Sequence, residues 1–200
     1  MAVKGAIAEK PQENRRGAVL ASAARSFARK GYDGTSIRDI AADVGVQPSS
    51  LYYFFRSKDD LFEAVYERGV EQILAAVEQA IGTTKKPWLR IERAAIAHLE
   101  SLLINGDYNA LVANIVPRGE SALEKRLIRH RDRYEILFVE LVNDLPLPVK
   151  IDRKIFRLTL LGSLNGVASW YRPGGAPPKK IAKKIVDMFR VQLDTDAGSK

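Results

Sequence analysis

An all-helical fold is predicted for this chain of 200 residues from three observations. Apolar residues recur every three to four positions in nearly every segment, which is typical of helices and not of strands. Clusters of glycine and proline interrupt this pattern, at "NGD", "PRGE", "DLPLPVKID" and "RPGGAPP". The hydrophobic content of 46% is enough for one sizeable core, or for a small module joined to a larger one.

The first helix, its turn and the next helix are each marked by recognisable signals. Leu20, Ala23, Ala24 and Phe27 lie on one helical face, and "KGYDGTS" ends that helix. Ser36 and Asp39 have the spacing of a capping box, which predicts the start of a second short helix. Its buried side is expected at Ile37, Ile40 and Ala41.

A glycine-containing turn and a third short helix follow. Gly45 breaks the chain, and Pro48 suits the first turn of a helix because its missing N–H costs nothing there. Leu51, Phe54 and Phe55 are expected to point inward. The polar and tyrosine side chains are left facing outward, namely Gln47, Ser49, Ser50, Tyr52 and Tyr53. Ser57 and Asp60 form another capping box that opens a longer helix to about Ala80.

This order of helix, short turn and short helix is the layout of a helix-turn-helix, whose second helix enters the major groove of DNA. Glutamine pairs with adenine, serine reaches base edges or phosphates, and tyrosine offers a hydroxyl to phosphate. The alternative is an ordinary helical hairpin in a bundle core. Two tyrosines beside two serines and a glutamine would make a poor apolar face for that role.

The stretch from Arg15 to Phe62 resembles the DNA-binding domain of the tetracycline-repressor (TetR) family. The resemblance includes Phe27, "GY.GTS", "IRDIA..VGV", "LYYFF" and "SKDDL" in order and at the family's spacing. It implies about nine helices, a three-helix DNA-binding domain and a larger domain that dimerises and binds a small molecule. We therefore divide the chain into a tail (1–14), a helix-turn-helix domain (15–60) and an effector domain (61–200), with 61–80 as a connecting helix.

The resemblance also implies which residues meet DNA. In such proteins the threonine or serine at the start of the second helix contacts phosphate, and the recognition helix contacts bases. The second tyrosine of the recognition helix and the lysine of "SK" also contact phosphate. These roles fall on Thr35, Ser36, Gln47, Pro48, Ser49, Ser50, Tyr52, Tyr53 and Lys58. Pro48 is a less usual occupant, so the base preference cannot be borrowed from relatives. The first ten or so residues are either disordered or a basic arm that adds Lys4 and Lys10.

The C-terminal part predicts a helical bundle. Helices are expected at about 88–104, in a short stretch after "NGD", and at about 121–143, 151–171 and 177–193. The helix at 121–143 has a stripe of period 3.6, made of Leu123, Leu127, Tyr134, Leu137, Phe138 and Leu141.

The last two helices are the predicted homodimer interface. Small residues let a partner approach closely, and apolar residues supply area. The predicted set is Phe156, Leu160, Gly162, Ser163, Gly166, Ile185, Met188 and Phe189. A two-fold dimer predicts a pseudo-palindromic operator. The alternative is that these residues close the core of a monomer.

A small-molecule effector is expected in the core, and no other cofactor. "SWYRPGG" is similar to TetR-family repressors of fatty-acid, steroid-ring and aromatic-acid degradation, some of which respond to CoA thioesters, so an acyl-CoA thioester is one candidate. Aromatic and amide side chains would line the pocket, and arginines would border its phosphates. The predicted set is Trp88, His98, Tyr108, Asn109, Arg118, Arg126, Arg129, Asn165, Trp170, Tyr171 and Arg172.

Charge also favours a polyanionic partner such as DNA. Ten basic and five acidic residues lie in 1–58, one and six in 59–80, and 21 and 13 in 81–200. Two basic regions therefore flank an acidic connector. For the C-terminal excess, an ordinary solvated surface is the alternative. A second alternative function is binding to a membrane surface or an acidic partner, because four lysines lie beside Ile181 and Ile185, at 179, 180, 183 and 184.

Other functions are excluded by what the sequence lacks. With no cysteine there is no disulfide, thiol catalysis or thiolate metal site, which fits a cytoplasmic protein. The longest mostly apolar run, Leu158–Trp170, is too short to span a bilayer. His98 and His130 are the only histidines, and no catalytic motif or metal-ligand spacing is present. We expect a ligand-responsive DNA-binding regulator, a repressor, and not an enzyme.

Overall fold

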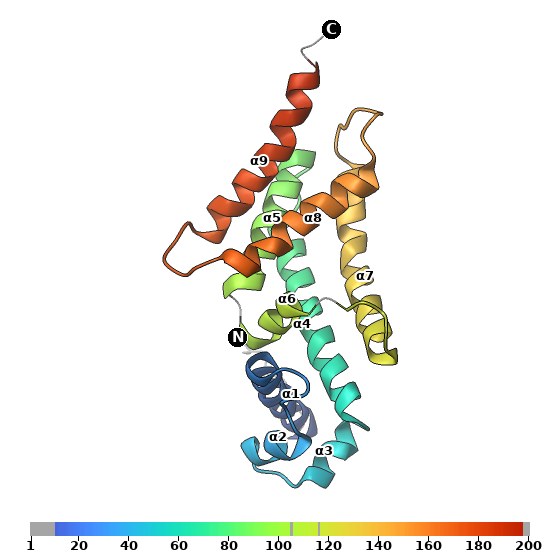
Figure 1. Cartoon of the computed structure of the whole chain (residues 1–200), viewed down its shortest axis with the longest axis vertical. Helices are drawn as coiled ribbons and strands as arrows, with labels where there is room; N and C mark the ends of the chain where they lie inside the picture. The colour runs from blue at the N-terminus through green and yellow to red at the C-terminus, as the bar shows by residue number, and fades with distance from the viewer. Residues whose placement is uncertain (1–10, 105, 116, 198–200) are drawn as a thin grey trace, which may run out of the picture. The chain divides into compact units, whose positions relative to one another are not determined.

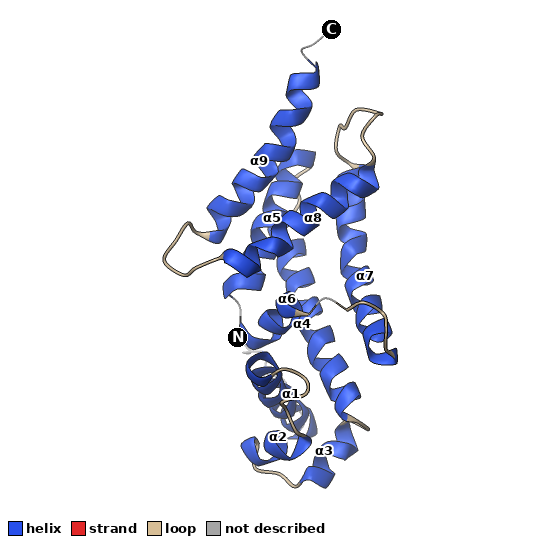
Figure 2. Cartoon of the chain, viewed as in Figure 1, coloured by secondary structure: helices blue, strands red, loops and turns tan. Residues whose placement is uncertain are grey.

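The computed structural model describes residues 11–104, 106–115 and 117–197. Within these residues it contains nine helices and no strand (Figure 2), which confirms the all-helical prediction. The chain forms two compact units, one ending at Val65 and the other beginning at Tyr66. Lys4 and Lys10, the predicted basic arm, lie outside the described residues.

The first unit is built on α1 (Pro11–Lys30), which begins within the stretch predicted as a tail. Its apolar face is buried, as its spacing predicts, at Val19, Leu20, Ala23, Ala24 and Phe27. The helix ends where Gly31 adopts a φ of 72° and donates its N–H to the Phe27 carbonyl at 3.0 Å. A side chain would be strained in that left-handed conformation, so glycine stops the helix at low cost.

α2 (Ile37–Asp43) and α3 (Pro48–Phe54) follow as two short helices joined by a turn. Ser36 caps α2, because its Oγ accepts the N–H of Asp39 at 3.1 Å. The second half of the predicted capping box is corrected, since the Asp39 carboxylate instead lies 3.9 Å from Lys30 Nζ. Gly45 turns the chain with a φ of 68°, and Pro48 occupies the first turn of α3 as predicted.

α4 (Lys58–Ile81) begins in the first unit and continues into the second. Ser57 Oγ accepts the N–H of Asp60 at 3.1 Å, which satisfies one of the helix's first free donors. The start of α4 is packed by Phe62, whose ring meets that of Phe27 edge to face at 4.9 Å.

The second unit adds five helices: α5 (Pro87–Ile104), α6 (Gly106–Asn114), α7 (Ala122–Asn143), α8 (Arg153–Trp170) and α9 (Pro178–Ala197). α5 contacts all four of the others, and α8 crosses it (Figure 1). α7 begins with a complete capping box between Ser121 and Glu124. These bounds lie close to the predicted ones, and α9 runs further than expected.

A close approach joins α4 to α6 in this unit. A Cβ atom added at Gly69 would lie 2.7 Å from the Tyr108 carbonyl oxygen and 2.7 Å from Val112 Cγ2. Real Cβ atoms do not come so near to other atoms, so glycine is what lets the two helix backbones meet here.

Candidate functional site

α3 presents a continuous polar face to solvent. Tyr53 is 74% exposed and Tyr52 53% exposed, whereas Leu51 is buried beneath them. Gln47, Ser49 and Ser50 are also exposed. Phe55 is buried as expected, and Phe54 is half-buried, with its ring against that of Tyr53 at 5.3 Å. The predicted orientation of α3 therefore holds, and its outward side chains are available to a partner.

α2 is tied to α1 by a carboxylate. Asp43 Oδ2 accepts from Ser22 Oγ at 2.6 Å and from Arg25 at 2.7 Å. These bonds hold the pKa of the Asp43 carboxyl below its ordinary value, the Ser22 hydroxyl contributing most. Because α2 contacts α3 in turn, this link fixes the helix on which the recognition helix rests.

Two predicted phosphate contacts at the start of α2 have different environments. Ser36 is exposed, and capping uses only an acceptor lone pair of its hydroxyl, which leaves the O–H as a donor. Thr35 is buried, and its hydroxyl donates to the Gly31 carbonyl at 2.8 Å. The Thr35 side chain thus helps to shape the turn, and of these two residues Ser36 is the one whose hydroxyl is exposed.

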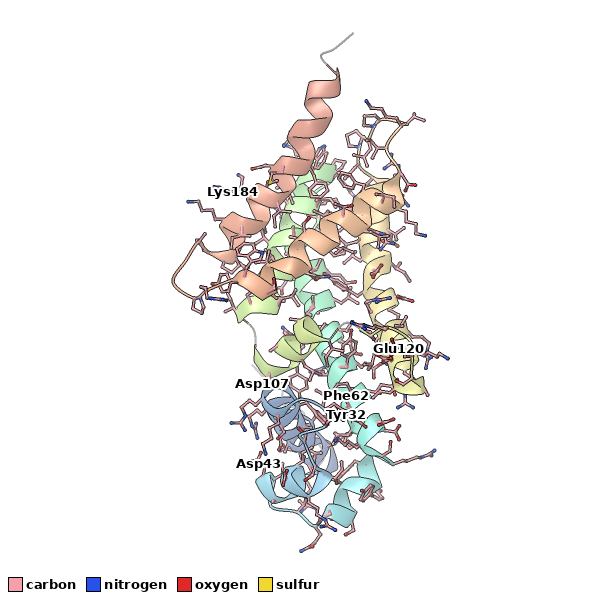
Figure 3. All side chains as sticks on the ribbon, viewed as in Figure 1. Tyr32, Asp43, Phe62, Asp107, Glu120 and Lys184 are labelled. Carbon is pink, nitrogen blue, oxygen red and sulfur yellow. The ribbon has the colours of Figure 1, made fainter. Side chains whose placement is uncertain are left out.

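Lys58 lies at the first turn of α4, against an aromatic cluster. Its ammonium is 4.3 Å from the ring centroid of Tyr32, whose hydroxyl donates to the Asp59 carboxylate. Figure 3 shows Tyr32 beside Phe62, and their rings meet edge to face at 5.1 Å. A cation over a ring keeps its three N–H donors, so Lys58 is positioned without losing its capacity to bind an anion.

The second unit encloses a cavity of about 260 Å³. Its walls come from α4, α5, α6, α7, α8 and the segment before α7, and most of them are apolar. The lining residues are Tyr66, Val70, Ile73, His98, Leu102, Val112, Ala113, Ile115, Pro117, Arg131, Tyr134, Glu135, Leu158, Leu161, Gly162 and Asn165. This volume lies just under the roughly 300–1,000 Å³ of sites that enclose a drug-sized ligand.

A chain of hydrogen bonds crosses one wall of the cavity. Tyr134 Oη lies 2.7 Å from His98 Nδ1, and His98 Nε2 lies 2.9 Å from Asn165 Oδ1. Burial lowers the pKa of His98 from 6.5 to about 4, against an opposing effect of the Asn165 bond. Burial likewise raises the pKa of Tyr134 well above 10. All three groups are therefore neutral at neutral pH.

Charged side chains on α7 and α8 lie beside this polar chain and pair with one another. Arg131 Nε is 3.3 Å from Glu135 Oε1, and Arg157 donates to the other oxygen of Glu135. Arg131 also meets Asp132 at 3.2 Å. Because each charge here has an opposite partner, this wall offers little unpaired charge to a ligand.

The structure separates the predicted effector residues into several places. Of the predicted effector residues, only His98 and Asn165 line the cavity. Trp88 packs on Phe156 at 6.5 Å, and Asn109 is buried on α6 with an Oδ1 atom that accepts no bond from the described residues. The others lie elsewhere: half-buried Tyr108 on α6, and Arg118, Arg126 and Arg129 before or on α7.

Trp170, Tyr171 and Arg172 line a separate, shallow groove at the turn between α8 and α9, with Lys184 and Met188. This groove contains none of the residues that line the cavity. The aromatic and arginine residues of "SWYRPGG" are therefore not brought together with His98 and Asn165.

Sequence reasoning missed the cavity residues Tyr66, Arg131, Tyr134 and Glu135. One signal was present in the stripe along α7. Between Leu127 and Tyr134, the position that continues the stripe is occupied by Arg131, a charged residue on an otherwise apolar face. Such an interruption indicates a paired or ligand-facing group.

The predicted dimer residues fall into two groups. Phe156 and Leu160 are buried within the unit, and the Phe156 ring packs on Phe189 at 5.2 Å. These residues close the core of the unit itself, as the alternative held. Gly162, Ser163 and Gly166 are exposed on α8, and Met188 is 70% exposed on α9. Ile185 and Phe189 are half-buried.

A helix-turn-helix unit joined to a cavity-bearing helical unit defines a DNA-binding regulator. Residues 19–65 match the family described as bacterial regulatory proteins, tetR family, and residues 84–193 match the tetracyclin repressor-like C-terminal domain. The chain belongs to the tetracycline-repressor (TetR) family, whose members are transcriptional regulators and not enzymes.

One curated relative and two solved structures illustrate what this chain is similar to. The repressor KstR2 of Mycobacterium tuberculosis is 26% identical over 171 residues, which cover 81% of this chain and 84% of KstR2. The superantigen PfiT shares the fold with a TM-score of 0.76 and 26% identity, covering 90% of this chain and 97% of PfiT. AibR, in complex with isovaleryl coenzyme A and operator DNA, has a TM-score of 0.75 and 21% identity, covering 87% of this chain and 97% of AibR.

Two further features bear on alternative functions. No helix among the described residues is long and apolar enough to cross a membrane. Nor do those residues bring three histidine, aspartate or glutamate side chains together as a metal site would require.

Proposed function

We propose that this chain is a cytoplasmic transcriptional repressor that binds a pseudo-palindromic operator as a homodimer and is released by a small hydrophobic or CoA-linked effector. The observation that carries the proposal is the exposed polar face of α3, supported on a buried Leu51. Tyrosine, serine and glutamine side chains would make a poor apolar surface for packing in a core. Exposed on a short helix, they are suited to contacts in a DNA groove.

The contacts to DNA divide into two kinds. Tyr53, Ser36 and Lys58 offer hydroxyl and ammonium donors, which suit phosphate oxygens and fix the position of the helix. Gln47, Ser49, Ser50 and Tyr52 share the exposed face of α3, where side chains meet base edges. Pro48 starts that helix.

Dimerisation is proposed through the exposed faces of α8 and α9. A Cβ atom added at Gly166 would meet nothing within 4 Å, so this part of α8 leaves room for a second helix. Gly162 has the same open space but also lines the cavity. Met188 supplies exposed apolar surface on α9. Two-fold pairing would set the recognition helices about 34–36 Å apart, one turn of DNA.

The cavity is the proposed effector site. Its apolar walls and single polar strip are typical of sites that orient a small hydrophobic molecule. A whole CoA exceeds about 260 Å³, so only the acyl part of a thioester would be enclosed. Arg118 is exposed directly after the lining residue Pro117, where it would border the rest of such a ligand. AibR, which has a similar fold, is in complex with isovaleryl coenzyme A, and this supports a thioester as a candidate effector.

Coupling between the sites is proposed to pass through α6 and α4. Val112 lines the cavity and also meets Gly69 of α4 at the close approach of the two helices. A ligand that displaces α6 would therefore press on α4, which continues to the helix-turn-helix unit. Any effector that favours one position of α4 would shift the population that fits the operator.

The test is selection of bound sequences from random duplex DNA, followed by titration of the winner at two salt concentrations. We expect an inverted repeat. Lys58→Ala should lower the slope of log K against log salt by about 1, because one phosphate charge is no longer neutralised. Tyr53→Phe should weaken binding to all sequences without changing that slope, because the lost contact is neutral.

Lys179→Ala is the matched control, since Lys179 is exposed on α9 and its loss changes the net charge equally. Enrichment of no sequence, or an equal slope for Lys58→Ala and Lys179→Ala, would contradict the proposed DNA interface.

A further inference from the structure

The polar strip in the cavity has a defined direction. His98 is 3% exposed and neutral, so one ring nitrogen carries a hydrogen and the other accepts. Asn165 Oδ1 can only accept, so His98 Nε2 donates to it at 2.9 Å. His98 Nδ1 must then accept from the Tyr134 hydroxyl at 2.7 Å. The strip therefore runs from Tyr134 through His98 to Asn165.

This direction determines what Asn165 offers to the cavity. Its carbonyl oxygen is already bound by His98, and the amide group is planar, so its orientation is set. The amide nitrogen, with two N–H donors, has no acceptor in the described part of the chain. Asn165 is exposed and lines the cavity, so these donors are open to a ligand there.

We propose that the effector places a carbonyl oxygen, carried on a compact apolar skeleton, against the side-chain amide of Asn165. This inference rests on the proposed function, in which the cavity is the effector site. His98 and Tyr134 are positioning residues, because they hold the amide and do not offer donors of their own. The carbonyl belongs either to a free ketone or ester or to the acyl end of a thioester.

Other ligand classes fit the wall less well. A carboxylate would lose its hydration, and the nearby cation Arg131 is already paired with Glu135 and Asp132. An ammonium offers only donors, so it could not bond to the N–H groups of Asn165. The Glu135 carboxylate in the lining is already paired with Arg131 and Arg157. An alcohol brings an O–H that must find its own acceptor, whereas a carbonyl needs only the donors that Asn165 has.

The test compares 1-indanone with indane, which share a skeleton and differ by the carbonyl group. Dissociation constants are measured on the full chain by ligand-observed NMR. We expect 1-indanone to bind about 3–10-fold more tightly, the range that one net hydrogen bond gives. Asn165→Leu should remove this preference while indane still binds. Asn143→Leu, the same substitution at the exposed last residue of α7 and outside the cavity lining, should keep it.

Asn165→Asp separates the lost donor from any damage to the fold. The carboxylate still accepts from His98 but has no N–H, so the preference for 1-indanone should again be lost. Equal binding of both probes to the parent chain would overturn the inference, as would binding of neither, or a preference that survives in both Asn165 variants.

A second arm identifies the source of the carbonyl. Isovaleryl-CoA is compared with free CoA, which lacks the acyl group. If isovaleryl-CoA binds more tightly than free CoA and this difference is lost in the Asn165 variants, the carbonyl belongs to a thioester. If only the preference for 1-indanone depends on Asn165, the carbonyl belongs to a free ketone or ester. These results are independent of operator selection: loss of the inverted repeat contradicts the regulator proposal, whereas failure here leaves operator binding intact.

Discussion

The recognition helix and the cavity both present polar side chains to a partner, but they hold them in different ways. At the recognition helix, the five outward side chains come from α3 and the residue before it, a stretch of seven residues, and are exposed. In the cavity, His98, Tyr134 and Asn165 come from three different helices and bond to one another, with the first two buried. One site is local and open, and the other is assembled by the fold.

Substitutions at the exposed side chains of the recognition helix should therefore affect binding with little effect on folding, whereas substitutions in the cavity should affect both. An exposed side chain without internal bonds can be replaced with little effect on folding. A buried, bonded side chain leaves an unsatisfied partner when it is removed, which costs about 1–3 kcal/mol. Changes at the exposed Ser49 and Ser50 of α3 should therefore alter DNA binding alone, whereas changes at the cavity's buried polar groups should alter stability as well.

The largest expected effect concerns the pH dependence of stability through His98. The pKa of His98 is about 4 in the folded chain and 6.5 when exposed. Between these values the unfolded chain binds a proton that the folded chain does not, so stability falls as pH falls from 6.5 towards 4. The full loss is about 3 kcal/mol. Urea unfolding followed by tryptophan fluorescence measures it, since both tryptophans, Trp88 and Trp170, lie in the second unit.

His98→Gln is the control for other groups that titrate in the same range. The variant is expected to be less stable at pH 7, but to lose less stability than the parent chain between pH 7 and pH 4.5. If both proteins lost the same free energy of unfolding between pH 7 and pH 4.5, His98 would not be held neutral. The hydrogen-bond direction from Tyr134 through His98 to Asn165 would then also be wrong.

A smaller effect is expected at Gly69, where α4 meets α6. The Cβ of Gly69→Ala would lie 2.7 Å from the Tyr108 carbonyl oxygen, so the helices must move apart. Overpacking costs about 1–3 kcal/mol, and the gain in helix propensity returns at most about 1 kcal/mol. We expect a net loss of about 1–2 kcal/mol by urea unfolding, and a changed response of operator affinity to effector.

Gly17→Ala, in α1 and outside both proposed binding surfaces of the second unit, is the matched control for Gly69→Ala. It also replaces a helical glycine, but its Cβ meets nothing within 4 Å. It should therefore stabilise the chain by up to about 1 kcal/mol. If both variants were stabilised alike, α4 and α6 would not be in the close contact described.

The same contrast explains what could be predicted from the sequence. The helix-turn-helix is encoded locally: Ser36 caps α2, Gly45 turns the chain, Pro48 starts α3 and Leu51 anchors it, all within a few positions. Such local signals can be recognised in the sequence without knowledge of the tertiary structure. The bond from the Thr35 hydroxyl to Gly31 could not be predicted, because it crosses a turn whose geometry no spacing rule gives.

The cavity could be predicted only in part, because its residues are far apart in the chain. His98 and Asn165 stood out as polar residues within apolar helices. Their partner Tyr134 looked like one more apolar position in the α7 stripe, and the bond between helices appears only once they pack. Trp170 and Arg172 were grouped with them by composition, yet the turn after α8 carries them to another groove.

The smallest effect on stability, and the sharpest contrast, is expected at Gln47. Gln47 precedes α3, is exposed, and makes no side-chain cap hydrogen bond. Gln47→Ala should change the free energy of unfolding by less than about 0.5 kcal/mol. It should still change the preferred bases, at about 1–3 kcal/mol per lost pairing, measured on the selected operator and its single-base variants.

Thr35→Val provides the opposite case within the same unit. It removes the buried hydroxyl bond to Gly31 while keeping the side chain's shape, so it should cost about 1 kcal/mol of stability and leave the base preference unchanged. Circular dichroism measures the first effect and operator titration the second. If Gln47→Ala destabilised the chain and Thr35→Val altered the base preference, the exposed face of α3 would not be the surface that reads DNA, because a reading side chain is one that the fold does not need.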